Sequence, residues 1–198
     1  MTSGPPPWTL EIVGARLAAH EARDYEDGGA DPRAAVAAIL REAPERGGID
    51  VMLIRRAEHP ADPWSGHMAL PGGRKDPIDE TVLHTIVRET REEIGLDLRK
   101  DATLLGRLDE IHAQHTSMVV APFVFRLDRS PELTPNHEVA EIVWGPLDAF
   151  ASGAVDGTMP YLFKGTRVDL PCFMVGDRIV WGLTYRMLCV LLEVLGAR

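Results

Sequence analysis

One helical stretch constrains this chain more than any other, because it sets three carboxylates beside an apolar face that has to be buried. At about 100° per residue, offsets of three and four return to the same side of a helix. Glu89, Glu92 and Glu93 therefore share one face. The adjacent apolar stripe is formed by Leu83, Ile86, Val87 and Ile94. Docking this stripe on a sheet brings the three glutamates to the rim of a packed core.

Residues typical of helix caps lie at both ends of this stretch. Asp76 can accept a hydrogen bond from a free helical amide, and Pro77 suits the first helical position, where no amide donor is needed. Asp79 then falls in the first turn, where the helix dipole favours negative charge. Because Gly95 can end a helix in the left-handed conformation, we expect one helix between Asp76 and Gly95.

The crowding of the three carboxylates requires a compensating positive charge. Like charges at this spacing destabilise a helix by a few tenths of a kcal/mol per pair, and partial burial increases that cost. A hard divalent cation reverses the sign of the interaction, and a ligand set made only of oxygen favours magnesium (Mg2+), with manganese (Mn2+) as a substitute. The alternative is a solvated charged face in which the glutamates pair with Arg88 and Arg91.

Elsewhere, apolar runs alternate with polar connections that contain glycine, a pattern that predicts an α/β sandwich on a mixed β-sheet. Prolines and glycines are dense between residues 58 and 75, where we expect an exposed loop. Residues 1–33 are expected to form an N-terminal tail with a short helix, and residues 34–198 one domain. The expected strands are 34–42, 49–57, 102–113, 117–127 and 139–147, and the further helices are 10–22 and 184–195.

Charge and composition narrow the class of partner. The 30 acidic residues exceed the 21 basic ones and give a net charge of −9, so the clustered lysines and arginines that bind long nucleic acid are missing. No apolar run approaches the roughly 18 residues that a bilayer requires, and the first residues do not resemble a secretory signal. We expect a soluble, cytoplasmic protein without a membrane partner, and whether it is a monomer or a homodimer stays open.

The helix and the residues before it resemble the signature of the Nudix hydrolases, which is a glycine, a glutamate, and then Arg-Glu-x-x-Glu-Glu-x-Gly at fixed spacing. The matching positions are Gly73, Glu80, Arg88, Glu89, Glu92, Glu93 and Gly95. Two departures stand out. Glu80 follows Gly73 by seven residues rather than the family's usual six, and Thr90 replaces the usual aliphatic residue.

This resemblance implies a Nudix α/β/α sandwich with a mixed sheet and assigns roles to single residues. Glu89, Glu92 and Glu93 match the metal-binding glutamates, and Glu80 and Arg88 match a pair that braces the loop against the helix. Members of the family hydrolyse a nucleoside diphosphate linked to another moiety. Such phosphoryl transfer needs positioning, charge neutralisation and an activated water, so we expect a metal-dependent pyrophosphohydrolase.

The sequence offers three carboxylates for the group that accepts the proton of the attacking water. Several members of the family carry such a carboxylate in a loop before a strand, and Glu138 lies in a loop of this kind. Glu141 is the competing residue, and Glu92 can also serve as the base.

Segments on both sides of the signature resemble the coenzyme A pyrophosphatase branch of the family. Residues 177–188 look like that branch, while Asp62 departs from it, because an acid there repels phosphate where the branch places an arginine. The upstream matches are Leu53, Arg56, Gly66, Pro71, Gly72 and Gly73. The branch splits coenzyme A into 3′,5′-ADP and 4′-phosphopantetheine, which makes coenzyme A the favoured substrate.

Substrate binding is expected from basic side chains and from the glycine turn. Arg56 matches the branch, whereas Arg55, its neighbour on the strand, is expected to face solvent. Arg74 and Lys75 follow Gly72 and Gly73, where backbone amides and basic groups can hold phosphate. ADP-ribose, a dinucleotide or a nucleotide sugar stay open as substrates, and so does a catalytically silent module that binds a nucleotide.

Overall fold

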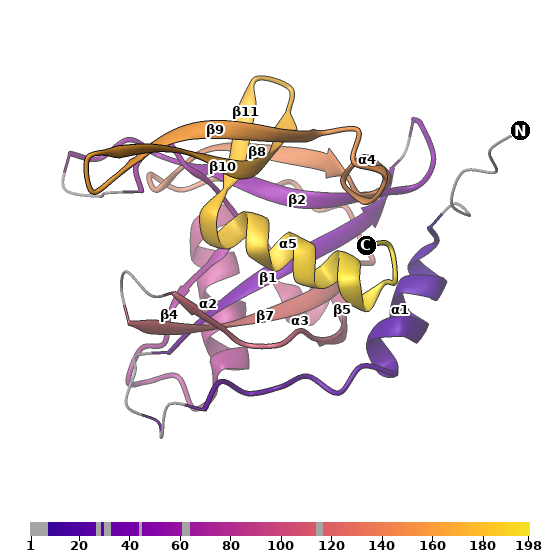
Figure 1. Ribbon diagram of the computed structural model, residues 1–198. Helices are drawn as coiled ribbons and strands as arrows, with labels where there is room; N and C mark the ends of the chain where they lie inside the picture. Colours follow the sequence, from indigo (N-terminus) through magenta and orange to yellow (C-terminus); the bar gives the residue numbers. More distant parts are fainter. Residues whose placement is uncertain (1–7, 27–28, 30–32, 44, 61–63, 114–116) are drawn as a thin grey trace, which may run out of the picture.

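A computed structural model describes residues 8–26, 29, 33–43, 45–60, 64–113 and 117–198 of the chain (Figure 1). The predicted α/β sandwich on a mixed sheet is confirmed. In the large sheet the order is β3-β2-β1-β7-β5, while β4 pairs with β1, β6 with β7 and β8 with β2. Its strands are β1 (Arg33–Glu42), β2 (Ile49–Arg56), β3 (Met68–Ala69), β4 (Gly72–Arg74), β5 (Ala102–Arg107), β6 (Ile111–Ala113), β7 (Met118–Leu127) and β8 (Val139–Pro146).

A second, smaller sheet and the helices complete the layers of the sandwich. The small sheet is antiparallel in the order β11-β10-β9, formed by β9 (Asp156–Phe163), β10 (Thr166–Val175) and β11 (Arg178–Trp181). The described helices are α1 (Leu10–Ala18), α2 (Val82–Ile94), α3 (Leu98–Asp101), α4 (Leu147–Ser152) and α5 (Gly182–Val194). Figure 1 shows α5 between the small sheet and the strands β1 and β7.

Two apolar cores fill the space on the two faces of the large sheet. Met52 and Ile54 of β2 pack in one core with Ile86 of α2, whereas their neighbours Val51 and Leu53 pack in the other core with residues of α5. This division follows from the alternation of side chains along a strand. The nearly continuous apolar sequence of β2 is therefore explained by burial on both faces of the sheet.

The hairpin of β1 and β2 opens at one end, and the opening is filled by two short strands, β3 and β4. The two strands pair only near their turn, where Leu40 lies opposite Val51 and Glu42 opposite Ile49. Farther along, β3 pairs with β2 and β4 pairs with β1. The predicted hairpin is thus confirmed, while the expected loop of residues 58–75 contains two strands.

Gly72 fits in this opening because it has no side chain. A Cβ atom there would lie 2.2 Å from the carbonyl oxygen of Ala35, and the φ angle of Gly72 is +143°, a conformation that residues with a side chain rarely adopt. The close contact with β1 fixes the position of the turn that leads to α2.

The helix that carries the glutamates ends as expected but begins later. Gly95 is its C-cap with a φ angle of 73°, whereas its N-cap is Thr81, whose hydroxyl accepts a hydrogen bond from the amide of His84. The predicted start at Asp76 is wrong, because the carboxylate of Asp76 accepts instead from the amide of Ile78 in a separate turn.

Other boundaries also differ from the sequence prediction. The predicted strand 102–113 is divided into β5 and β6, and the small sheet was not predicted, since the sequence of β9 contains both a glycine and a proline. Val13 and Leu17 of α1 lie in the same core as residues of α5. The predicted boundary between an N-terminal tail, residues 1–33, and the domain that follows it stays a prediction. Within the described ranges, no helix has the length and apolar character needed to cross a membrane.

Replacing Gly72 by alanine tests the role of the opening in the sheet. We expect the Gly72→Ala chain to lose about 2–4 kcal/mol of unfolding free energy, because the new methyl group must displace the backbone of β1. Gly165→Ala is the matched control, since Gly165 also has a positive φ but no atom lies within 4 Å of its added Cβ. Urea denaturation followed by circular dichroism measures both; equal losses would contradict the proposed contact.

Candidate active site

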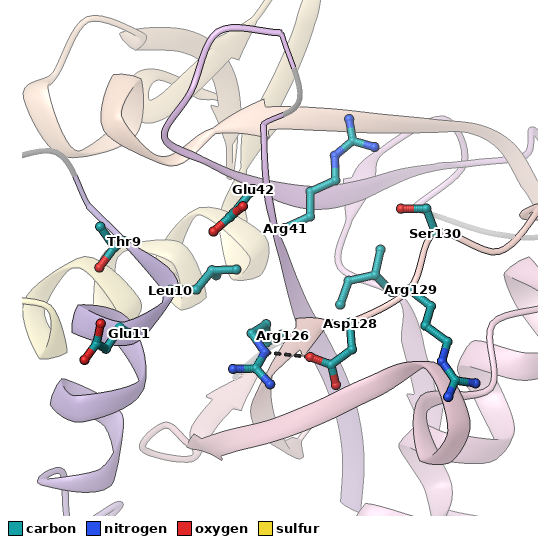
Figure 2. Close-up of a pocket in the computed structure, with 10 residues that line it drawn as sticks. Thr9, Leu10, Glu11, Arg41, Glu42, Arg126, Asp128, Arg129 and Ser130 are labelled. Carbon is teal, nitrogen blue, oxygen red and sulfur yellow. Dashed lines mark hydrogen bonds and ion pairs between the residues drawn. The ribbon is translucent and has the colours of Figure 1, made fainter.

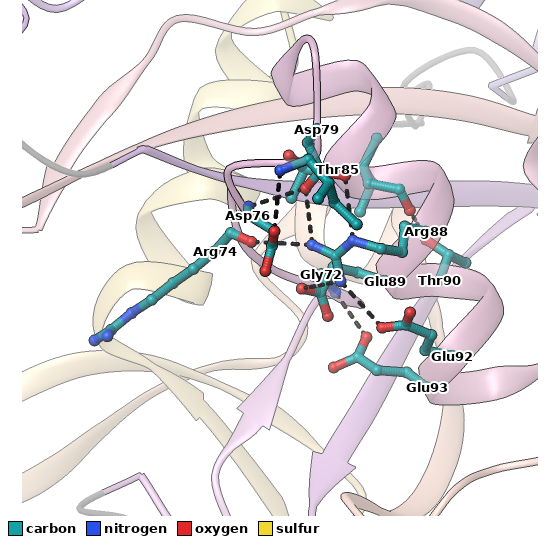
Figure 3. A network of polar contacts seen from close by, with 12 residues as sticks. Gly72, Arg74, Asp76, Asp79, Thr85, Arg88, Glu89, Thr90, Glu92 and Glu93 are labelled. Carbon is teal, nitrogen blue, oxygen red and sulfur yellow. Dashed lines mark hydrogen bonds and ion pairs between the residues drawn. The ribbon is translucent and has the colours of Figure 1, made fainter.

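Arg88 is the centre of a polar network that ties α2 to the turn before it (Figure 3). Its Nη2 lies 2.8 Å from Oδ2 of Asp79 and its Nε lies 3.2 Å from Oδ1, so the carboxylate is held through two nitrogens. The same Nη2 donates to the carbonyl of Arg74 at 3.2 Å. Hydrogen bonding to Arg88 lowers the pKa of Asp79, and hydrogen bonding to Asp79 raises the pKa of Arg88.

The predicted pairing of Arg88 with Glu80 is wrong. The side chain of Glu80 is 84% exposed and makes its contact with His84, at 3.7 Å, whereas the side chain of Asp79 is 5% exposed. Asp79 lies six residues after Gly73, which is the spacing that the family signature requires. The spacing from the glycine could therefore have identified Asp79, although the spacing to Arg88 fits Glu80.

The three glutamates of α2 differ widely in exposure. Glu93 is 2% exposed and accepts a hydrogen bond of 2.8 Å from the amide of Gly72. Glu89 is largely buried and Glu92 is mostly exposed, and both accept from Nη1 of Arg88, at 2.9 and 3.0 Å. The alternative of a solvated face is therefore wrong for Glu93, although the expected pairing with Arg88 exists for the other two.

Gly73 brings the turn against the carboxylate of Glu89. A Cβ atom at Gly73 would lie 2.5 Å from the carboxyl carbon of Glu89, so the backbone itself packs on this group. Together, Gly72 and Gly73 hold the turn against two of the three glutamates. This contact explains why the turn before α2 carries two glycines in succession.

Burial gives the glutamates unusual proton affinity. The pKa of Glu93 is raised to about 8, chiefly by burial and also by the charges of Glu89 and Glu138, against the opposing effects of the Gly72 amide and of Arg56. Burial also raises the pKa of Glu89, where Arg88 opposes and Glu92 and Glu138 add to the shift. Unfavourable charge is thus concentrated at one place on α2, as the sequence predicts.

The chemistry of these side chains fits a hard divalent cation, because all the candidate donors are carboxylate oxygens that repel one another. In the described ranges no three His, Cys, Asp or Glu side chains converge as a ready metal site. Arg88 supplies the positive charge beside Glu89 and Glu92, and the Gly72 amide satisfies Glu93. The assignment of metal to Glu89, Glu92 and Glu93 therefore stays a prediction.

The loop before β8 places Glu138 near this cluster. The amide of Asn136 donates to the carbonyl of Glu93 at 2.8 Å, and the amide of Ala57 donates to the carbonyl of Glu138 at 2.7 Å. The loop is thereby fixed to the end of α2 and to the end of β2. The side chain of Glu138 is 54% exposed, and its charge acts on both Glu89 and Glu93.

Glu141, the competing candidate for the base, lies in a different environment. Nε of Arg178 donates to it at 2.9 Å, a second nitrogen of Arg178 contacts its other oxygen, and Arg55 lies 3.5 Å away. Hydrogen bonding to Arg178 lowers the pKa of Glu141, which weakens it as a base. The expectation that Arg55 is simply solvated is wrong, because Arg55 forms an ion pair with Glu141.

The remaining side chains that were predicted to bind substrate are Arg56, Arg74 and Lys75. Arg56 follows Ile54 by two residues on β2, so it lies on the face that packs against α2, and its charge lowers the pKa of Glu93. Figure 3 shows the side chain of Arg74 extending away from the glutamates, and the backbone amide of Lys75 donates to the carbonyl of Arg33 at 2.8 Å. Asp62 lies outside the described residues.

A hollow of about 680 Å³ lies elsewhere, between the start of α1 and the ends of β1 and β7 (Figure 2). Arg126 and Asp128 form an ion pair within it, with 2.6 Å between Nε and Oδ1. Its basic residues are matched by Glu11 and Glu42 among its lining residues. No residue of the predicted site lines this hollow.

Comparison with known proteins gives a consistent family. The family model described as NUDIX domain matches residues 31–163, two thirds of the chain. An uncharacterized protein of Schizosaccharomyces pombe is 42% identical over 49% of this chain and 32% of its own length. The human mitochondrial coenzyme A diphosphatase NUDT8 is 33% identical over 77% of this chain and 66% of its own length. The chain thus spans between about a third and two thirds of these relatives.

Among solved structures, the Nudix hydrolase RenU of M. smegmatis is 27% identical. The superposition has a TM-score of 0.50 and covers 61% of this chain and 74% of that chain. The similarity in sequence and the similarity in structure therefore point to the same family.

Replacing Asp79 or Glu80, one at a time, tests which of the two acids holds Arg88. We expect Asp79→Asn to lower the unfolding free energy by about 1–3 kcal/mol, because Arg88 loses the buried carboxylate that it binds through two nitrogens. Glu80→Gln is the matched control and should change stability by less than about 0.5 kcal/mol. Urea unfolding of both variants measures the difference, and a larger loss for Glu80→Gln would restore the predicted pair.

The raised pKa of Glu93 predicts that the metal-free protein is less stable at higher pH. Between 4.5, the ordinary pKa of a glutamate, and about 8, the folded chain binds more protons than the unfolded chain, so stability falls as the pH rises through this window. We expect a decrease on the order of a few kcal/mol between about pH 5.5 and about pH 8.5.

Glu93→Gln provides the reference for this measurement, because its amide oxygen can still accept from Gly72 but does not titrate. Urea denaturation at both pH values, with a chelator present, should show a much smaller pH dependence in this variant. An equal dependence in the two proteins would assign the effect to other groups.

Proposed function

Because the chain belongs to the Nudix family, we propose that it is a metal-dependent pyrophosphohydrolase. It cleaves the diphosphate bridge of a nucleoside diphosphate linked to another moiety. The observation that carries this proposal is the burial of the Glu93 carboxylate beside Glu89 at the Gly72–Gly73 turn, where it accepts a hydrogen bond from the amide of Gly72. A protein keeps such a cluster at a cost in stability.

Each part of the site has a distinct task in the proposed reaction. Glu89, Glu92 and Glu93 would hold Mg2+ or Mn2+, which when bound would neutralise the diphosphate and make water more acidic. Arg88, braced by Asp79, sets the orientation of Glu89 and Glu92. The turn at Gly72 presents its backbone to the substrate, and Arg56 offers a positive charge on the same side of the sheet.

Glu92 and Glu138 are the two candidates for the group that accepts the proton from the attacking water. Both side chains are more than half exposed, and both act electrostatically on Glu89. Glu92 pairs with Arg88 at 3.0 Å, whereas the ion pair of Glu138 is a longer contact, 3.9 Å, with the exposed side chain of His137. We therefore rank Glu138 first.

Coenzyme A is the proposed substrate, with 3′,5′-ADP and 4′-phosphopantetheine as products. The support is the resemblance of residues 53–73 and 177–188 to the coenzyme A branch and the similarity to the human coenzyme A diphosphatase. ADP-ribose, a dinucleotide and a nucleotide sugar are the alternatives in the same reaction class. The proposed location in the cell is the cytoplasm.

A nucleotide-binding module without activity is the rival function from another class. It is favoured by one observation, the hydrogen bonds that Arg88 donates to the carboxylates of Glu89 and Glu92. Incubation with coenzyme A and ADP-ribose in ¹⁸O-water, with Mg2+ or Mn2+, separates the two functions. Mass spectrometry should find the products of diphosphate cleavage with the label on one phosphate; tight binding of a nucleotide without release would establish the module instead.

Conservative replacement of the glutamates tests the assignment of the chemistry. We expect Glu92→Gln and Glu93→Gln to stay folded and to lose at least about 10²-fold in kcat, the lower scale for loss of acid–base catalysis. Glu132→Gln, at an exposed glutamate outside the site, is the matched control. Turnover near that of the unchanged protein in both site variants would refute the assignment.

A further inference from the structure

Residues 19–26, which we call the N-terminal strap, lie between α1 and β1 and precede the part of the chain that the NUDIX model matches. In Figure 1 the strap leaves α1 and runs below β7 in the view. Nε2 of His20 and the amide of Arg23 each lie 3.0 Å from Oδ1 of Asp109. The amide of Glu110 donates to the carbonyl of Arg23 at 2.9 Å. The strap is therefore attached to the segment between β5 and β6 by backbone and by side-chain contacts.

Glu110 joins the strap to β1. Its side chain is 8% exposed, and one oxygen, Oε2, accepts from the amide of Tyr25 at 2.9 Å and from Nη1 of Arg33 at 3.1 Å. Nη1 of Arg107 lies 3.7 Å from the other oxygen. Loss of this buried carboxylate would leave its partners without their acceptor, which costs free energy. Glu110 thus holds the strap and the first residue of β1 together.

Arg33 is that first residue, and its backbone lies between two other strands. It pairs with Val119 of β7, and its carbonyl accepts from the amide of Lys75, directly after β4, at 2.8 Å. The ends of a strand open more readily than its centre, because fewer contacts hold them. The ion pair with Glu110 opposes such opening and keeps the carbonyl of Arg33 in place for Lys75.

The amide of Lys75 marks one end of the turn that contacts the glutamates of α2. One residue earlier, the carbonyl of Arg74 accepts from Nη2 of Arg88 at 3.2 Å (Figure 3). The other terminal nitrogen of Arg88 donates to Glu89 and Glu92. The position of the start of β1 therefore affects the guanidinium that orients two of the three carboxylates.

We propose that Glu110 is a positioning residue for the reaction. Through Arg33 and the amide of Lys75 it fixes the turn that carries Gly72 and Gly73, and the N-terminal strap completes its hydrogen bonding. A displacement of about 1 Å can cost on the order of a hundredfold in rate where a reaction depends on positioning. Glu110 acts on the geometry of the glutamates and not on the substrate. This inference rests on the proposed function for the reaction that is positioned.

Hydrogen exchange followed by NMR tests the link without requiring turnover. In Glu110→Gln and in Arg33→Gln the amide of Lys75 should exchange about tenfold faster, as expected when the charged hydrogen bond that anchors its acceptor is lost. The amide of Ala43, which donates to the carbonyl of Gly48 at the other end of β1, should keep its rate. Equal acceleration of both amides would indicate a general loss of stability and would overturn the assignment.

Turnover provides a second readout. Both variants should lose about tenfold to a hundredfold in kcat and change KM by less than about threefold, because the groups that bind substrate are untouched. Since the two residues act through one ion pair, the double variant should lose no more than about twofold beyond the weaker single variant. Losses that multiply in the double variant would contradict the link.

Two further variants make the outcome decisive. Asp128→Asn is the matched control, because Asp128 pairs with Arg126 of β7 at the opposite end of the sheet, and it should leave the exchange of Lys75 and kcat unchanged. Arg33→Lys keeps the positive charge and should recover part of the lost kcat. It also replaces Glu110→Gln in the comparison if that variant fails to fold. No recovery in Arg33→Lys, or an equal loss in Asp128→Asn, would count against the ion pair.

The same measurements separate this inference from the proposed function. If the protein hydrolyses a nucleotide conjugate while Glu110→Gln and Arg33→Gln keep both kcat and the exchange of Lys75, the inference about Glu110 fails and the enzyme remains. If no conjugate is cleaved but the exchange of Lys75 depends on Glu110, the link between the strap and the turn is established and the proposed activity fails.

Discussion

The burial of the Glu93 carboxylate against the amide of Gly72 is the interaction on which the arrangement of the site depends. The amide is available because β1 and β2 separate and let the turn approach β1 closely enough that only glycine fits. One hydrogen bond does not offset the cost of removing a carboxylate from water, so the pKa of Glu93 rises. The fold thus holds a carboxylate whose ionised form a nearby positive charge would stabilise. This is the condition for binding a cation tightly.

Arg88 limits how far this unfavourable charge extends. It compensates Glu89 and Glu92 but makes no contact with Glu93, and its own position is set by Asp79 and the carbonyl of Arg74. The turn and the helix are therefore fixed to each other before any ligand arrives. Such preorganisation is what a site that acts through positioning and electrostatics requires.

The helix, the hairpin and the glutamate cluster could be predicted because their signals are local. Apolar periodicity located α2, and Gly95 marked its end. The start of α2 could not be located in this way, because Asp76 and Thr81 are both residue types that cap helices. Which of the two caps α2 depends on the ion pair between Arg88 and Asp79, and this contact is not local in sequence. The small sheet was missed for a similar reason, since its strands are stabilised by packing on α5 and their own sequences contain glycine and proline.

Strand β8 contains one extra residue, Ala140, where its register with β2 shifts between Arg55 and Arg56. On one side of this shift Glu141 pairs with Arg55 and Arg178, and on the other Val139 packs in the core that contains Ile86 of α2. One inserted residue thus lets neighbouring carboxylates of the same chain segment serve two separate surfaces of the sheet.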